Sequence, residues 1–198
     1  MVEGKTEDVF KGYLLGFLKT RFPSGAMPRI SFDRFDGRIP KEGRLQRRVN
    51  LYLNDHSNPA HHVIALTDVY TGTGDFQNAA DAKNKMRAWV GDNSQFHPHV
   101  ALYDFAAWLL PFWDEIQRKS GSNRASPGPQ PELVNHQSPP SRRIEEAFRT
   151  GKGRRYVKTR DALTILKGKD LLVSANACPE LKAFLNTLLK LAGGELIP

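Results

Sequence analysis

Three acidic residues stand where an α/β protein commonly carries its catalytic carboxylates. Asp68 and Asp104 each follow an apolar segment that is predicted to be a strand, and Glu3 lies in a Gly-containing turn before a predicted helix. In open α/β sheets the ligand crevice lies beyond the carboxyl ends of the strands, and Mg²⁺ is commonly bound by a few carboxylates and several waters. We therefore expect the three acids to converge on one or two metal ions. For Glu3, simple capping of the helix is the alternative.

A dense run of basic residues lies in the second half of the chain. Positions 142–169 hold ten Lys or Arg residues against three acids. The whole chain has 29 Lys and Arg against 21 Asp and Glu, a net charge of +8, and residues 111–198 carry most of this excess. Such a density is typical of a face that binds a polyanion, and a solvated helix surface is the alternative. Charge alone leaves both open.

The elements that must position these residues alternate between helix and strand. Apolar residues spaced three and four apart predict helices, and nearly continuous apolar runs predict buried strands. Helices are expected at 7–22, 45–53, 79–90, 105–118, from 141 onward, at 159–167 and at 179–191, and strands at 29–32, 62–67 and 100–102. This alternation predicts an α/β fold with a mainly parallel sheet flanked by helices.

A stretch rich in Pro, Gly and Ser divides the chain at residues 120–140 and is predicted to be a long surface loop. We expect an α/β core at 1–119, and a basic helical C-terminal part at 141–198 that packs on the same domain. The 198 residues are enough to bury one compact core.

Composition and local motifs exclude several classes of protein. No apolar run approaches the roughly 18–20 residues of a membrane span, so no membrane association is expected. The single cysteine, Cys178, cannot form an internal disulfide, which favours a cytoplasmic protein with a structural thiol. The loop after Asp68 lacks the Gly-Lys-Ser/Thr ending of a P-loop. A zinc hydrolase built on His97 and His99 is an alternative that lacks its usual companion ligands. The aromatic residues at 108–113 are expected to pack in the core.

Five short motifs follow one another in a characteristic order. They are VEGKTE at 2–7, DVY at 68–70, LYDFAAWLL at 102–110, PSRRI at 140–144 and Cys178-Pro179. Together they are similar to the bacterial family filed as domain of unknown function 4276, a Toprim-fold relative of the nuclease domain of OLD-type proteins. The resemblance spans nearly the whole chain and implies a Toprim-like α/β fold.

The resemblance also implies metal-dependent phosphodiester chemistry. In Toprim sites the first Glu serves as a general acid/base or metal ligand, and the strand-end Asp binds Mg²⁺ or Mn²⁺. Carried over to this chain, the catalytic and metal-binding roles fall on Glu3, Asp68 and Asp104, with Glu7 as a further metal ligand.

The basic part of the chain matches the family as well. The PSRRI segment corresponds to the family's PSKR, which implies that Arg142 and Arg143 bind a phosphate, with Tyr156 and Lys158 on the same surface. We therefore expect a nuclease that acts on DNA or RNA. By resemblance it belongs to a bacterial defence or toxin-like system with an ATPase partner of the ABC/AAA type, and the family pattern also allows a homodimer.

The chain departs from the family pattern at several site positions. Where the family has HEFEALL, Tyr103 replaces the His, Asp104 shortens the first Glu, and Ala106 removes the second. Tyr70 stands where a Toprim has its second Asp, and Asp75 is the residue that could compensate. Nothing before Val2 is long enough for the strand that normally precedes the glutamate, which suggests a truncated or mis-assigned start. These departures make a catalytically degenerate nucleic-acid-binding or regulatory subunit the main alternative.

Overall fold

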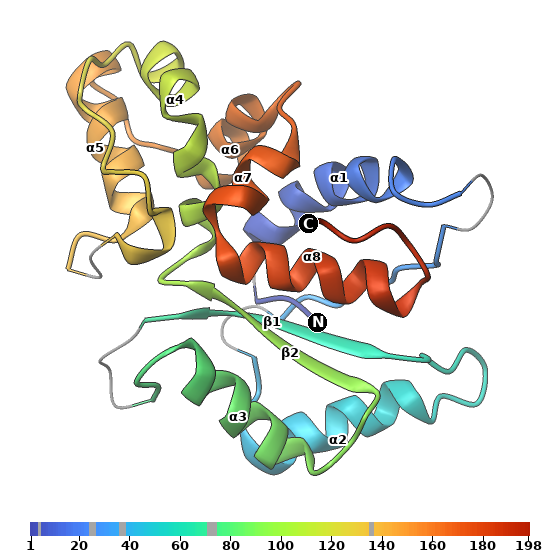
Figure 1. Cartoon of the computed structure of the whole chain (residues 1–198). Helices are drawn as coiled ribbons and strands as arrows, with labels where there is room; N and C mark the ends of the chain where they lie inside the picture. Colours follow the sequence, from blue (N-terminus) through green and yellow to red (C-terminus); the bar gives the residue numbers. More distant parts are fainter. Residues whose placement is uncertain (4, 24–26, 36–38, 71–74, 135–136) are drawn as a thin grey trace.

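The computed structural model describes residues 1–3, 5–23, 27–35, 39–70, 75–134 and 137–198, with the backbone alone for 5–9 (Figure 1). The elements follow the order α1 (Lys5–Lys19), α2 (Glu42–Leu53), β1 (Val63–Val69), α3 (Ala79–Val90), β2 (Phe96–Leu102), η1 (Phe105–Phe112), α4 (Trp113–Ser120), η2 (Pro131–Leu133), α5 (Pro140–Lys152), α6 (Lys158–Leu166), α7 (Leu171–Ala177) and α8 (Pro179–Leu191).

The sheet is parallel, as expected. β1 pairs with β2 in a register that runs from Val63 opposite Phe96 to Val69 opposite Leu102. The first two residues of the chain lie on the other side of β1, because Val2 forms a parallel bridge with Leu66. The pairing that precedes Glu3 is therefore present, although it is only two residues long. The strand predicted at 29–32 is absent, and Arg34 alone pairs with Val2.

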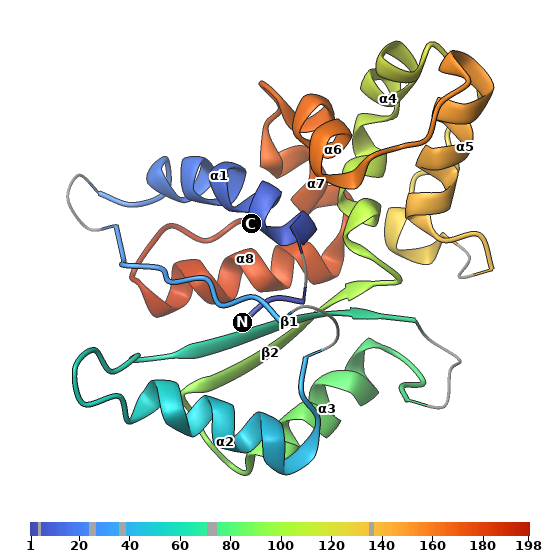
Figure 2. The ribbon, with the colours of Figure 1, turned by 180° about the vertical axis from the view of Figure 1, so that it is seen from behind.

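Helices cover both faces of the sheet. One face carries Val63, Ala65, Val69, Phe96 and Val100, which pack with buried residues of α2 and α3. The opposite face contributes Leu66 and Ala101 to a second cluster, which includes residues of α1 and α8. Figures 1 and 2, two opposite views, show α2 and α3 on one side of the strands and α1 and α8 on the other. The α/β class is thus confirmed, in an arrangement consistent with a Toprim-like fold.

β2 begins four residues earlier than predicted, because Pro98 and two histidines interrupt its apolar pattern. Tyr103 N donates to Val69 O at 2.9 Å, and Val63 N donates to Gln95 O at 2.8 Å. The backbone N–H and C=O groups of the odd-numbered residues of β2 therefore point toward β1, whereas the nitrogen of Pro98 points away from it. An edge strand tolerates a proline in that position, since no ladder hydrogen bond is lost.

The predicted helix at 105–118 is divided in two. Residues 105–112 form the 3₁₀ helix η1, and α4 begins at Trp113, two residues after Pro111. Proline has no N–H for the helical ladder and clashes with the preceding turn. Trp108 is 1% exposed and packs against Phe10 and Phe184, so the expected core role of these aromatics is confirmed.

The helices after the loop share a core with the N-terminal helix. The larger buried cluster joins residues of α1 and η1 to residues of α5, α6, α7 and α8. Cys178 is fully buried at the start of α8, and burial raises the pKa of its thiol, with a smaller contribution from the charge of Glu132. This agrees with the structural role predicted for the thiol. Among the described residues, no helix is both long and apolar enough to cross a membrane.

Candidate functional site

Three neighbouring segments that run in parallel bring the predicted acids to one edge of the sheet. Glu3 follows Val2, which pairs with β1. Asp68 is the next-to-last residue of β1, and Asp104 lies two residues beyond the end of β2. Because parallel strands end at the same edge, Glu3 and Asp104 lie on either side of Asp68. The prediction that the acids meet at the carboxyl ends of the strands therefore has a geometric basis.

The carboxylate of Glu3 is held against the sheet by two donors. The hydroxyl of Thr67 donates to Glu3 Oε1, and the backbone N of Ile39 lies 3.4 Å from the same oxygen. Thr67 is 6% exposed, so this hydrogen bond lies inside the protein. Glu3 thus does more than precede a helix, because its side chain is oriented by β1 and by the segment before α2.

Glu3 and Asp68 line a common cavity of about 110 Å³. The polar lining consists of Glu3, Lys41, Thr67, Asp68, Tyr70 and Asp75, and the apolar lining includes Ile39, Phe76, Met86 and Trp89. Asp75, which the sequence suggested as a replacement for the missing acid, therefore lies with the other two carboxylates. Lys41 Nζ is 2.6 Å from Asp75 Oδ1, so an ammonium group also faces this cavity.

Asp104 has a different environment, although it lies next to the same site. Its Oδ1 accepts from Ala106 N at 3.0 Å, which caps η1. Its Oδ2 accepts from Ser141 N in the first turn of α5 at 3.3 Å and from the Tyr70 hydroxyl at 3.5 Å. Asp104 is only 1% exposed and is not among the residues that line the cavity. Its carboxylate joins the ends of two helices, and its role as a metal ligand stays a prediction.

Tyr70 connects Asp104 with the cavity. Its ring lines the cavity, and its hydroxyl donates to Asp104. Burial raises the pKa of the Tyr70 phenol, and the negative charges of Asp104, Asp68 and Glu3 raise it further. One neutral hydroxyl therefore lies within the electrostatic field of all three predicted acids. Tyr70 is therefore a hydrogen-bond donor that faces carboxylate acceptors.

The cavity fits a hydrated Mg²⁺ or Mn²⁺ ion in its donor chemistry. Its carboxylates are the oxygen ligands that these ions prefer, and such ions commonly keep several waters. In the part of the chain that the structure describes, however, no three His, Cys, Asp or Glu side chains form a group that could hold a metal. The side chain of Glu7, a further predicted ligand, lies outside the described residues. Glu3 and Asp68, which line the same cavity, therefore stay the candidate ligands, and most of the ion's coordination positions would be filled by water.

The predicted phosphate-binding residues begin directly beside Asp104. Arg142 and Arg143 follow Ser141 in the first turn of α5. Arg142 is exposed and donates to Gln137 O at 3.4 Å, whereas Arg143 is half-buried. Lys158 is exposed at the first position of α6. Arg142 and Arg143 therefore lie within one helical turn of Ser141, whose N–H donates to Asp104, and Lys158 lies on the following helix.

Tyr156 differs from the expectation that it extends the same surface. Its hydroxyl is buried without a hydrogen-bond partner, and its ring packs on Phe148 at a centroid distance of 5.6 Å. Burial raises the pKa of the phenol, and the charges of Asp104 and Asp161 raise it further. The side chain belongs to the packing between α5 and α6, and its contact with phosphate stays a prediction.

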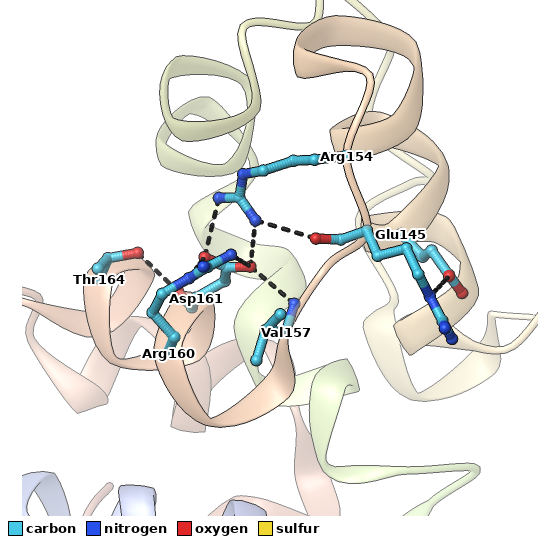
Figure 3. A network of polar contacts seen from close by, with 7 residues as sticks. Glu145, Arg154, Val157, Arg160, Asp161 and Thr164 are labelled. Atoms are coloured by element: carbon cyan, nitrogen blue, oxygen red, sulfur yellow. Dashed lines mark hydrogen bonds and ion pairs between the residues drawn. The ribbon is translucent and has the colours of Figure 1, made fainter.

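Part of the basic run is neutralised within the protein (Figure 3). Asp161 is 2% exposed and accepts from both terminal nitrogens of Arg154 at 2.8 and 2.9 Å. It also accepts from Arg160 at 3.0 Å and from Val157 N at 2.7 Å. The guanidinium of Arg154 lies 4.6 Å from the ring of Phe148. These arginines fix the connection between α5 and α6, so two of the ten basic side chains are already engaged with an internal carboxylate.

His97 and His99, the pair of the zinc alternative, have different surroundings. His99 is 7% exposed, its Nδ1 is buried without a hydrogen-bond partner, and its ring packs on Phe184. His97 instead meets His62 of the neighbouring strand. Burial lowers the pKa of His99 to about 4, and the charge of Lys83 adds to this effect, so His99 is neutral at pH 7.

Sequence reasoning did not find two residues of the site. Lys41 precedes α2 in a polar segment, and nothing in its local pattern indicates that it faces a cavity. Thr67 is part of the apolar run of β1, where a hydroxyl would be expected to bond to the backbone. Period-two alternation along β1 places Thr67 on the face covered by α2 and α3. This alternation is the one sequence signal that could have indicated that Thr67 lines the cavity.

No curated protein and no solved structure matches this chain. A family model does match, and it covers residues 2–189, which is nearly the whole sequence. The matched range includes both the carboxylate cavity and the basic helices α5 and α6. The chain belongs to the family described as Domain of unknown function (DUF4276).

Proposed function

We propose that this protein is a Mg²⁺- or Mn²⁺-dependent Toprim-like nuclease that acts on DNA or RNA. The observation that carries the proposal is the meeting of Glu3 and Asp68, from adjacent parallel segments, in one cavity. Tyr70 of this cavity is hydrogen-bonded to Asp104, which in turn accepts from the first turn of the basic helix α5. An acidic centre flanked by arginines is suited to a phosphodiester, since the arginines attract the phosphates that the carboxylates alone would repel.

Glu3 and Asp68, which line one cavity, would hold the divalent ion, and waters would fill its other coordination positions. A bound ion of this kind polarises a phosphoryl oxygen and offsets the charge that develops on it. The donor set fits a single, mostly hydrated ion better than a fully protein-coordinated pair, because Asp104 gives its oxygens to Ala106 N, Ser141 N and Tyr70.

The chain's own residues would position the substrate around this centre. Arg142 and Arg143 would bind a backbone phosphate next to the cavity. The Tyr70 hydroxyl stays protonated, because its pKa is raised, and can donate a hydrogen bond to a phosphate oxygen or to Asp104. Lys41 can exchange Asp75 for a phosphate oxygen, since its ammonium group is half-exposed at the cavity.

The proposal includes a second protein. By family resemblance we propose an ABC/AAA-type ATPase partner in a bacterial defence or toxin-like system, acting in the cytoplasm. A homodimer of this chain is part of the same proposal.

Cleavage of supercoiled plasmid DNA and of tRNA tests the proposal. The wild type is incubated with Mn²⁺ or Mg²⁺, alone and with the candidate ATPase, beside Asp68→Ala and the control Asp92→Ala. Asp92 is exposed in the loop between α3 and β2, away from the cavity. We expect cleavage by the wild type and by the control, and none by Asp68→Ala. Equal cleavage by all three proteins would remove this carboxylate from the mechanism.

A catalytically degenerate nucleic-acid-binding or regulatory subunit is the second candidate. Two observations favour it: the cavity already contains the Lys41 ammonium, and Asp104 is committed to backbone N–H groups. Calorimetric titration with Mn²⁺ distinguishes the two candidates. Absence of heat, combined with salt-sensitive RNA or DNA binding that Arg142→Ala weakens, would support the degenerate subunit.

A further inference from the structure

Two histidines meet at the end of the sheet opposite the carboxylate cavity. His97 is the second residue of β2 and pairs in register with Ile64, and His62 lies two residues before Ile64. Because side chains alternate along a strand, His62 and His97 lie on the same face of the sheet. The hydrogen bond from Val63 N to Gln95 O, at 2.8 Å, fixes the two strands next to the pair. Their backbone positions are therefore set before any ligand binds.

The distance between the two imidazoles matches the spacing of metal ligands. His97 Nε2 is 3.2 Å from His62 Nδ1, and the rings are tilted by 53° with their centroids 5.2 Å apart. Two nitrogens that each lie ~2.05 Å from a tetrahedral ion are about 3.3 Å apart. An ion could therefore bridge the two nitrogens at about their present separation, once the rings turn so that both lone pairs point at it. A simple imidazole–imidazole hydrogen bond has the same spacing and is the alternative that an experiment must exclude.

Access and protonation both suit a ligand pair. His62 is exposed, and His97 is half-buried, so an ion reaches the pair from solvent. Burial lowers the pKa of His97, and the charges of His62 and Arg87 lower it further, which keeps this ring in the neutral, ligating form at pH 7. The positive charge of Arg87 opposes a cation, so only an ion that binds imidazole strongly will be retained.

We propose that His62 and His97 form a binding site for one imidazole-preferring divalent ion, Zn²⁺, Ni²⁺ or Cu²⁺, at the amino-terminal edge of the sheet. Neutral imidazole suits these ions, whereas Mg²⁺ and Ca²⁺ prefer oxygen ligands. No third His, Cys, Asp or Glu joins the pair in the residues that the structure describes, so water fills the remaining coordination positions. The site differs from the proposed carboxylate site in its ligands, in its ion and in its place at the other end of β1.

Calorimetric titration of the full chain with Zn²⁺ tests the site. The proteins are the wild type, His62→Ala, His97→Ala, the neighbouring control His61→Ala, and Asp68→Ala, which alters the cavity. Two-bond ¹H–¹⁵N spectra of the histidine rings identify the ligating nitrogens. We expect saturable binding of one ion, lost in His62→Ala and His97→Ala and retained in the other two variants, with shifts at His62 Nδ1 and His97 Nε2.

Three results would overturn the proposal. Wild type without saturable Zn²⁺ binding would show that the pair is a hydrogen bond only. Binding that survives in both His62→Ala and His97→Ala would place the ion elsewhere. Binding lost in Asp68→Ala but kept in His97→Ala would assign Zn²⁺ to the cavity, which leaves the proposed function standing and removes this inference. Because His62 is exposed, its variant should melt with the wild type, and a melting curve checks this.

Discussion

Replacing Asp104 with Ala should destabilise the protein in a way that does not depend on metal. The carboxylate accepts from Ala106 N, Ser141 N and the Tyr70 hydroxyl, and it is 1% exposed. Losing a helix cap costs about 1 kcal/mol, and each buried donor left without an acceptor costs about 1 kcal/mol or more. Because the hydrogen bonds of Ser141 and Tyr70 are long, we expect a total of about 3 kcal/mol.

For a protein of this size, about 3 kcal/mol corresponds to a melting temperature lower by about 6–12 °C. Asp104→Asn keeps one carbonyl oxygen and should lose about half as much, whereas the exposed control Asp92→Ala should melt with the wild type. Thermal unfolding followed by circular dichroism, with Mn²⁺ and with EDTA, measures these shifts. A shift below about 2 °C for Asp104→Ala, or one that appears only with Mn²⁺, would refute the capping role and favour metal ligation.

Three further predictions concern the rest of the chain. Asp161→Ala should lower the free energy of unfolding by about 2–3 kcal/mol, because it leaves Arg154 half-buried without its partner. In the wild type, burial raises the pKa of Asp161, but the hydrogen bonds from arginines and from the backbone outweigh burial and hold this pKa well below its usual value. The stabilisation from Asp161 is therefore present above about pH 4 and is lost as the pH falls further. Urea unfolding from pH 7 to pH 3 measures this loss. Cys178 should resist a thiol reagent in the folded protein and react in urea, and fast reaction of the native thiol would contradict its burial. Gly151→Ala should lower the melting temperature or the soluble yield, since a Cβ there would lie 2.2 Å from Ser120 O; unchanged melting would show that this approach relaxes freely.

The sequence predicted those parts of the fold that local pattern determines. The bounds of α3 and α8 agree with the prediction, because each has a clear start: Asn78 caps α3, and Pro179 opens α8. The prediction missed α7, which has only seven residues, too few to establish a helical period. It also missed the pairing of Val2 with β1, because a two-residue strand has no periodicity and depends wholly on its partner.

The site was predictable only in part, for a related reason. Asp68 could be identified because it stands at the end of a predicted strand, where a sheet gathers its ligands, whereas Glu3 was assigned only through the resemblance of its motif. Nothing local indicates that Lys41 contacts Asp75, 34 residues further on. The same holds for Asp104, whose Oδ2 accepts from the backbone of Ser141, 37 residues away. Such contacts depend on how helices pack, which a single sequence does not record in its spacing.

Two departures from the family motif can be explained as one structural change. Ala106, where the resembled motif has a glutamate, is 5% exposed within the apolar cluster, and a carboxylate there would need partners of its own. Asp104 is shorter than the glutamate it replaces, and a short acid is the type that folds back onto the N–H groups of a following helix. The N–H that it accepts from is that of Ala106 itself. Both changes are therefore consistent with one structural role, in which Asp104 caps η1 by accepting from the N–H of Ala106. In the proposed metal site the ligands would therefore be Glu3 and Asp68, and Asp104 would act on it only through its hydrogen bond to Tyr70.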